Sequence, residues 1–402
     1  MSPLSGLTVL DLSRVLSGPF CTMQLADMGA RVIKIEHPIH GDDTRAWGPP
    51  WVPGGSTRES SYFLSTNRNK ESVALDFKTA EGRDLLDRLV AKADVLVENF
   101  RPGSLAKIGF DYASLGPKFP RLIYASISGF GQTGPRSAEA GYDAMIQAEG
   151  GLMSITGRAD SQPVRLGVAI SDIAAGMMAT QGILLALIAR GTTGRGQHVD
   201  ISMFDTTLAL LTYQAQRTLI TGVPPVRSGN RHASIAPYDT FSVSDGTLVL
   251  AVGNDDQWQR FCRAAHLGAA SRDPRFATND ARVRHYDALH PIIAAALQTE
   301  TVETWLARLR EAGVPVGAVR SIDEVLADAQ TAARDMVTQV SHPSVGDLPI
   351  LGIPIKLSAT PGQVRSAPPT LGQHTRAVLT KDLGVSPAEF LALADRGVVK
   401  CS

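Results

Sequence analysis

Cysteine is scarce in this sequence, and that scarcity excludes several classes of protein. Only Cys21, Cys262 and Cys401 occur in 402 residues. An odd number of cysteines without a C-x-x-C pair or Cys/His spacing argues against a disulfide framework and against structural zinc. We therefore expect no bound metal and a reducing, cytoplasmic location. Cys21 lies in an apolar stretch, where a small buried thiol is commoner than a nucleophile.

The sequence also lacks an excess of charge of either sign. Lys plus Arg and Asp plus Glu both number 39, without a long run of either. Such a balance argues against wrapping a nucleic-acid backbone or lying on an anionic membrane, so we expect neither as a partner. The N-terminus lacks a basic start followed by an apolar signal core, and Thr180 and Gln181 interrupt the apolar stretch 173–189. We expect that stretch to be a buried helix.

The first half of the chain contains apolar runs that alternate with helical patterns. The pattern predicts an α/β fold with a doubly wound, mainly parallel sheet, in which ligands gather beyond the carboxyl ends of the strands. The expected strands are 7–13, 30–36, 72–77, 94–100, 121–128 and 198–203. The expected helices include 19–29, the one that Thr79 caps and a single helix over 204–222.

A different pattern follows a Pro- and Gly-rich stretch. We expect a large Rossmann-like domain over 1–222, a linker over 223–237 and a smaller α+β domain over 238–330. Asp245-Gly246 is typical of a hairpin turn between two strands of that small domain. The segment 331–402 lacks an obvious core of its own, so we expect it to pack back on the large domain.

A dinucleotide-binding enzyme is one alternative. Glu36 ends the second predicted strand, where such enzymes place an acid on the cofactor ribose. The G-x-G-x-x-G fingerprint that would follow the first strand is missing, because only Gly18 occurs there. The glycines of 191–197 follow a helix and lack the G-K-[ST] ending of a phosphate loop, so a helix end and a turn explain them better.

Asp172 is the one carboxylate near the start of the apolar stretch "RLGVAISDIAAGMMATQGILLALIAR". We expect a strand at "LGVAI" and a helix after it, so an acid at this boundary could cap the first helical turn. From the segment alone, capping is the more common role. Catalysis stays open.

Cationic side chains follow two of the predicted strands. Lys78 stands beside the helix start at Thr79, where backbone amides and an ammonium together suit a phosphate. Arg101 and Lys107 follow the strand 94–100, near the polar Asn99. Each cation alone is most simply a surface charge, but together they could form a rim for a phosphorylated ligand.

Several segments in the same order resemble the class III CoA-transferase family, which includes formyl-CoA and carnitine CoA-transferases. The similarity covers nearly the whole chain. The resemblance implies an open Rossmann-like large domain, a smaller domain and two subunits threaded through each other as an interlaced homodimer. It also implies that Asp172 is the nucleophile and that coenzyme A is part of the substrate. The segments are "LDLSRVLSGPFCTMQLADMGARVIKIEHP", "LDFKTAEG", "DVLVENFRPG", "GFGQTGPRS", "GYDAMIQAEGG", "GVAISDIAAGMMA", "TGRGQHVDISMFD" and "LGQHT".

The resemblance also implies positions that bind CoA. His37 and Lys107 stand at positions that are arginine in some relatives, and neither reproduces the bidentate fork of Arg on phosphate. The full set of implied CoA contacts is Leu16, His37, Leu75, Lys78, Asn99, Arg101, Lys107 and Tyr142.

The family scheme moves CoA from an acyl-CoA to a free acid through an aspartyl anhydride and an aspartyl-CoA thioester. The likeness is greatest to members that use succinyl-CoA and short dicarboxylic acids, and Arg231 or His232 could meet the distal carboxylate. Two alternatives remain. An α-methylacyl-CoA racemase would need a His where Tyr142 stands, since a neutral phenol cannot complete its acid/base pair. A CoA-binding protein without turnover is the other, although the retained Asp172 speaks against it.

Overall fold

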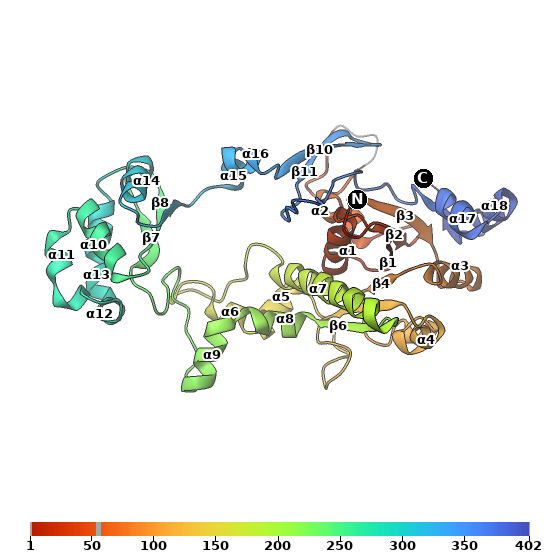
Figure 1. Ribbon diagram of the computed structural model, residues 1–402, viewed down its shortest axis with the longest axis horizontal. Helices are drawn as coiled ribbons and strands as arrows, with labels where there is room; N and C mark the ends of the chain where they lie inside the picture. The colour runs from red at the N-terminus through yellow and green to blue at the C-terminus, as the bar shows by residue number, and fades with distance from the viewer. Residues whose placement is uncertain (1, 54–57, 402) are drawn as a thin grey trace. The chain divides into compact units, whose positions relative to one another are not determined.

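The structure, a computed structural model, describes residues 2–53 and 58–401. The chain divides into two compact units, which are described separately (Figure 1). Unit 1 comprises Met1–Leu152, Leu166–Gln216 and Ala329–Ser402, and unit 2 comprises Met153–Arg165 and Arg217–Asp328.

A seven-stranded sheet forms the centre of unit 1 in the described part of the chain. Its order is β12-β3-β2-β1-β4-β5-β6, and all neighbours are parallel except β12, which pairs antiparallel with β3. Val, Ile and Leu dominate these strands because both faces of a parallel sheet are covered. The strands are β1 (Thr8–Asp11), β2 (Arg31–Glu36), β3 (Lys70–Leu75), β4 (Val95–Glu98), β5 (Ile123–Ser128), β6 (His198–Ser202) and β12 (Val399–Lys400).

Helices cover both faces of this sheet, and side chains alternate between them along each strand. Helices α1 (Ser17–Asp27) and α7 (Ile170–Thr193) share one apolar core with alternate strand residues such as Val9 and Val97. On the other face, Leu10 and Leu96 pack with α3 (Ala80–Val90), α4 (Tyr112–Lys118), α17 (Thr375–Leu383) and α18 (Pro387–Asp395). The C-terminal segment therefore completes a core that the N-terminal strands begin.

Unit 1 also contains shorter elements. They are η1 (Asp43–Ala46), α2 (Ser61–Thr66), η2 (Ala106–Ile108), α5 (Asp143–Glu149), α8 (Met203–Leu210), α16 (Ala329–Ala333), and the hairpin of β10 (Val337–His342) with β11 (Gly346–Leu351). Helices α6 (Leu152–Ile155) and α9 (Thr212–Thr221) contain two of the four points where the chain passes between the units, and the other two follow Arg165 and Asp328.

Unit 2 has an antiparallel sheet of order β7-β8-β9 with helices packed on it around the buried Trp258 and Trp305. The hairpin predicted at Asp245-Gly246 is confirmed, because Ser242 pairs with Thr247 across it. The elements are β7 (Tyr238–Ser242), β8 (Thr247–Ala251), α10 (Asp255–Ala264), α11 (Gly268–Arg272), η3 (Pro274–Phe276), α12 (Asn279–Arg284), α13 (Tyr286–Leu297), α14 (Val302–Glu311), β9 (Val316–Ala318) and α15 (Ile322–Leu326).

Helix α7 is the one helix in the described residues that is long and apolar enough to cross a membrane by length and composition. In the structure it packs along α1, β5, β6 and α8, so one face belongs to the core of unit 1 (Figure 1). It ends at Gly194, whose φ of 70° is the left-handed conformation of a helix stop, as the glycines of 191–197 predict.

The predicted α/β class is confirmed, but two local predictions are wrong. The segment "LGVAI" forms no strand in the described chain, and α7 begins directly at Ile170 after an irregular stretch. The single helix expected after β6 is two, because Thr212 adopts a φ of 41° between α8 and α9. A β-branched residue in that conformation interrupts the helical hydrogen bonds.

Candidate active site

The candidate site lies where the strand order of unit 1 reverses. Strands β1 and β4 are neighbours in the sheet, but their following connections turn to opposite sides, which opens a crevice beyond their carboxyl ends. Asn99 follows β4, and its side chain spans this crevice: Oδ1 accepts from the N–H of Arg14 at 2.8 Å, and Nδ2 donates to the carbonyl of Arg14 at 2.7 Å. The two strand ends are thus tied together.

Asp172 lines a cavity of about 340 Å³ at this point. Three of the residues predicted to bind CoA, Asn99, Arg101 and Tyr142, line the same cavity. The structure therefore brings the predicted nucleophile together with side chains that follow β4 and precede α5. Residues that the sequence analysis did not single out also line it, among them Arg14, Ser17, Asp43, Ser128, Glu139 and Met203.

A second cavity, of about 280 Å³, lies beside the first and contains His37, Leu75 and Lys78. Arg14 and Phe100 line both cavities, so the two are adjacent. The Arg14 guanidinium lies 5.4 Å from the centre of the Phe100 ring and pairs with Asp43 at 3.0 Å. An elongated ligand could extend from Asp172 past Phe100 to Lys78.

Two of the predicted CoA residues do not line either cavity in the described structure. Leu16 is buried at the N-cap of α1, and Lys107 is exposed in η2. Lys78 is exposed directly before α3, whose cap Thr79 accepts from the N–H of Gly82 at 3.0 Å, as its helix-start pattern predicts. A cation beside this helix start is suited to a phosphate group.

Asp172 does not cap α7. Ala169 occupies the N-cap without a side-chain capping bond in the described chain, and the N–H of Ser171 donates to Asp143 Oδ1 at 2.9 Å. Asp143, in α5, therefore satisfies the start of α7 from outside the helix, and Gln147 Nε2 holds its other oxygen at 2.7 Å. The Ser171 hydroxyl accepts from Thr207 Oγ1 at 2.9 Å. The carboxylate of Asp172 is therefore not used for helix capping and lines the cavity.

The surroundings of Asp172 favour its neutral form. Burial raises the pKa of its carboxyl to about 6, and the like charge of Asp143 adds to the increase. Hydrogen bonds from the side chain and backbone of Ser17, at the start of α1, lower the pKa in part. A carboxylate with a pKa near 6 is ionised at neutral pH and is more basic than an exposed aspartate, which suits a nucleophile.

Comparison with known proteins identifies the family. Residues 4–375 match the family described as CoA-transferase family III. The chain belongs to CoA-transferase family III.

Relatives of this transferase span its length. It is 45% identical to the succinate–glutarate CoA-transferase of Agrobacterium fabrum over 94% of this chain and 95% of that protein. It is 41% identical to the succinyl-CoA:glutarate CoA-transferase of Mus musculus over 100% of this chain and 91% of that protein. A CaiB/BaiF family protein from Brucella suis has a crystal structure that matches with a TM-score of 0.85 at 44% identity, over 95% of this chain and 99% of that one.

The buried charges behind the site exclude the dinucleotide alternative for this transferase. Both oxygens of Glu36 are taken, since Arg45 contacts them at 2.7 and 2.8 Å and Ser72 Oγ donates to Oε1 at 2.6 Å. The N–H of Asp42 also donates to Glu36 at 3.0 Å. The acid that could have bound a ribose therefore holds the loop after β2 instead.

Cys21 is not suited to nucleophilic chemistry. It is fully buried in α1, and burial raises the pKa of its thiol to about 12. In the described residues, no group of three or more His, Cys, Asp or Glu side chains is arranged to hold a metal ion.

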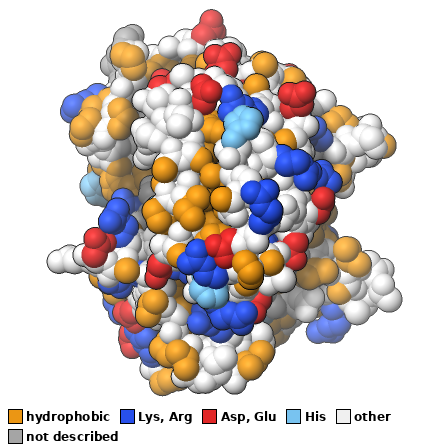
Figure 2. Space-filling model, turned by 90° about the vertical axis from the view of Figure 1, so that its left-hand side faces the viewer, with side chains coloured by type: hydrophobic (Ala, Val, Ile, Leu, Met, Phe, Trp, Pro, Cys, Tyr) orange, Lys and Arg blue, Asp and Glu red, His pale blue; other side chains and the backbone are white. Residues whose placement is uncertain are grey.

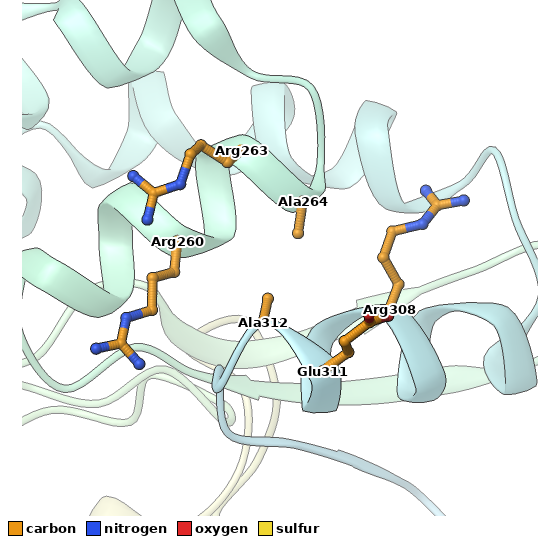
Figure 3. A pocket seen from close by; sticks show the side chains of 6 residues that line it. All are labelled: Arg260, Arg263, Ala264, Arg308, Glu311 and Ala312. Atoms are coloured by element: carbon orange, nitrogen blue, oxygen red, sulfur yellow. The ribbon is translucent and has the colours of Figure 1, made fainter.

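A cavity in unit 2 of the transferase is lined by Arg260, Arg263 and Arg308 (Figure 3). The guanidinium groups of Arg260 and Arg263 extend to one side and that of Arg308 to the other, so they do not converge. Helices α10 and α14 both end here, and their C-terminal dipoles disfavour an anion. Basic and acidic side chains are mixed over the face in Figure 2.

Arg231 and His232 lie in unit 2. Arg231 donates to the carbonyl of Val283 at 3.2 Å and stacks on Tyr286, with 4.2 Å between guanidinium and ring centre. The His232 ring packs beside Tyr238. The suggestion that either residue meets the distal carboxylate of a substrate stays a prediction.

Proposed function

We propose that the enzyme transfers CoA from succinyl-CoA, or a similar acyl-CoA, to a short dicarboxylic acid, with Asp172 as the nucleophile. One observation carries the proposal: Asp172 lines the crevice at the strand reversal, while Asp143 performs the capping that would otherwise engage a carboxylate there. The names of the relatives, which include succinyl-CoA:glutarate CoA-transferase, support the choice of dicarboxylic acids.

The first half of the reaction loads CoA onto the enzyme. The Asp172 carboxylate attacks the thioester carbonyl of the donor, the carbon–sulfur bond breaks, and CoA leaves as a thiolate. The product is a mixed anhydride between Asp172 and the donor acid. The thiolate then attacks the Asp172 carbonyl, which releases the donor carboxylate and leaves an aspartyl-CoA thioester. A thioester is an activated carbonyl, so fixing the two groups in attack geometry supplies much of the acceleration.

The second half reverses these steps with the acceptor. The acceptor carboxylate attacks the carbonyl of the aspartyl thioester, which forms a second mixed anhydride with Asp172 and expels CoA thiolate. The thiolate attacks the acceptor carbonyl of that anhydride and leaves as the new acyl-CoA, and the Asp172 carboxylate is regenerated. No water is consumed and no proton is transferred overall. Backbone N–H groups aimed at the developing oxyanion would assist each attack.

The adjacent cavities support a division of the CoA molecule between them. Lys78, at the start of α3, suits a phosphate group, and the apolar Leu75 and Phe100 suit a flat ring or the pantetheine arm. The thioester then reaches Asp172 past Arg14 and Asn99. His37 lines the second cavity and can add to phosphate binding there, whereas Lys107 would act from outside both cavities.

We also propose that the enzyme is a homodimer, interlaced as in its family. Apolar side chains on the outer side of α7 support this, because large exposed apolar patches mark interaction surfaces. Leu185 and Ile188 are 66% and 72% exposed, and Met177 and Met178 lie on the same helix.

The decisive test replaces Asp172 with Asn. Asn keeps the shape and removes the attacking oxygen anion, so exchange between succinyl-CoA and glutarate should fall at least a thousandfold while the circular dichroism spectrum is unchanged. Hydroxylamine added to wild type during turnover should convert Asp172 to a hydroxamate, which mass spectrometry of its peptide detects. Near-normal exchange in Asp172→Asn, or an unmodified Asp172 peptide, would contradict the mechanism.

The same assays separate the two alternatives. Deuterium from solvent at the α-carbon of a 2-methylacyl-CoA, without exchange of CoA between acids, would indicate a racemase. Binding of acyl-CoA without either reaction would indicate a protein that only binds CoA. We expect exchange alone.

A further inference from the structure

The loop between β1 and α1 is held in an unusual conformation next to Asp172. Val15 has a φ of 69°, a strained conformation that is rare for a β-branched residue. The loop folds tightly onto the helix that follows, since a Cβ at Gly18 would lie 2.2 Å from Cβ of Ser13. Such a strained backbone persists only when contacts with the surrounding structure stabilise it. We therefore expect groups from other elements to bind this loop.

Three consecutive residues of the loop are held by groups from other elements. Asn99 binds the N–H and carbonyl of Arg14, as described above. The N–H of Val15 donates to Asp42 Oδ1 at 3.2 Å. Lys34 Nζ donates to the carbonyl of Ser13 at 2.8 Å.

Lys34 and Asp42 also form an ion pair with each other at 2.9 Å, and both side chains are completely buried. Although burial opposes its ionisation, Lys34 lowers the pKa of the Asp42 carboxyl to about 2, so it is charged at neutral pH. A buried pair of this type contributes little net stability, because an apolar pair of similar size folds as well or better. Folding stability alone therefore does not explain the presence of the buried Lys34–Asp42 pair.

We propose that Lys34 and Asp42 are positioning residues that hold the Ser13–Val15 loop so that Ser17 faces the nucleophile Asp172. Both line the second cavity, that of Lys78, but neither lines the cavity of Asp172, so any effect on Asp172 passes through the loop. Ser17 begins α1 two residues after Val15, and Arg14, Val15 and Ser17 line the same cavity as Asp172. This inference rests on the proposed function of Asp172.

Every charged or titratable group near Asp172 bears on the readout. Asp143 of α5 raises the pKa of Asp172, and Asp172 in turn raises that of Tyr62 in α2. The other charged or titratable side chains that line the same cavity are Arg14, Asp43, Arg101, Glu139 and Tyr142. Ser17 is the group that lowers the pKa of Asp172, so losing its contact should move the acid limb of activity to higher pH.

The test compares two double variants. Lys34→Met/Asp42→Leu removes both contacts to the loop, and Lys34→Met/Asp42→Asn keeps an acceptor for the N–H of Val15. The pH dependence of kcat/KM for succinyl-CoA and of hydroxamate formation at Asp172 is measured for each. In the first variant we expect kcat to fall at least tenfold and the acid limb to rise by about one pH unit, the order expected for a lost hydrogen bond to a carboxylate. The second should lie between it and wild type.

Two controls make the result specific. Ser17→Ala should shift the acid limb in the same direction. Arg190→Met/Asp94→Leu replaces another largely buried pair, at 3.0 Å near the amino ends of the strands, and should leave the limb where it is. A thermal melt shows that each variant is folded. If Lys34→Met/Asp42→Leu does not fold, the comparison of Lys34→Met/Asp42→Asn with wild type must still show a raised limb.

The inference is overturned if the folded variants keep the acid limb and kcat of wild type, or if their whole loss appears in KM. Asp172→Asn, assayed in parallel, separates failure of the positioning role from failure of the proposed function. Loss of exchange in Asp172→Asn with wild-type behaviour in the loop variants would refute only the positioning role. Retained exchange in Asp172→Asn would refute the proposed function itself.

Discussion

Asp172 illustrates how one side chain acquires its properties from burial and from two neighbours. Asp143 takes over the start of α7 and raises the pKa of Asp172 by repulsion, while Ser17 lowers it by hydrogen bonding. A residue that could have been an ordinary helix cap becomes a carboxylate that is ionised at neutral pH and half-buried in a cavity. If α7 supplied its own capping group at this position, Asp172 would be engaged in capping and would not be available to the cavity.

The pH dependence of activity should report this arrangement. Because attack needs the carboxylate, and burial raises the pKa of Asp172 to about 6, kcat/KM should fall tenfold per pH unit below about 6. Asp143→Asn keeps an acceptor for the N–H of Ser171 and removes the like charge, so the acid limb should move to lower pH. Glu311→Gln, at an exposed glutamate that ends α14 and does not line this cavity, serves as the control and should leave the acid limb unchanged. A limb that stays in place in Asp143→Asn would contradict the electrostatic role.

The arrangement of strands and helices decides where the ligand-binding side chains lie. The carboxyl ends of the parallel strands β1, β3 and β4 lie on the same side of the sheet, and helices α1 and α3 begin shortly after β1 and β3. Strands β2 and β1 lie between β3 and β4, so Lys78 and Asn99 line the two adjacent cavities and not the same one.

Lys78→Ala tests the role of the α3 start. Lys78 is exposed beside the helix N-terminus, and a cation there serves binding of the ground state and transition state alike. We expect KM for succinyl-CoA to rise about tenfold with kcat changed less than twofold. Lys92→Ala, just beyond the far end of α3, should have no effect. A collapse of kcat at unchanged KM would assign Lys78 to the chemistry instead.

Glu98, at the end of β4, makes the stability of this edge depend on pH. Burial raises the pKa of its carboxyl to about 7, although Ser126 and the N–H of Phe100 hydrogen-bond it. Because the folded pKa lies above the unfolded one, the group stabilises the fold at pH values below the unfolded pKa. That contribution is lost as pH rises through about 7.

Glu98→Gln should remove this decrease in folding stability at high pH. The amide oxygen can still accept from Phe100 without a charge, so the midpoint of thermal unfolding should exceed that of wild type at pH 8 and match or fall below it at pH 4. Glu311→Gln, an exposed glutamate at the end of α14, should change neither. Equal midpoints of Glu98→Gln and wild type at pH 8 would show that the buried carboxyl is not destabilising.

The whole molecule leaves an apolar helix face exposed, which a second copy would cover. Sedimentation at low micromolar concentration should show a species of about two chains, and unfolding should shift to higher temperature as protein concentration rises. Leu185→Lys/Ile188→Lys places charges on that face and should weaken the dimer. A wild-type monomer at these concentrations would remove the dimer proposal.

Short-range patterns in the sequence were enough for the fold class, the family and the enzyme class. Strand and helix periods depend on neighbouring residues, and the order of several motifs along the chain is specific to one family. The cap at Thr79 and the helix stop at Gly194 were predictable for the same reason. The strand expected at "LGVAI" fails because local β preference there has no partner strand.

The contacts that set the chemistry depend on residues far apart in the chain. Asn99 lies 85 residues from Arg14, and Asp143 lies 28 residues before Ser171, so no local pattern links them. Lys34 and Asp42 look like ordinary surface charges in the sequence and are completely buried. Burial and hydrogen-bond geometry, which change a pKa or hold a loop, arise only when the sheet brings separate strand ends together.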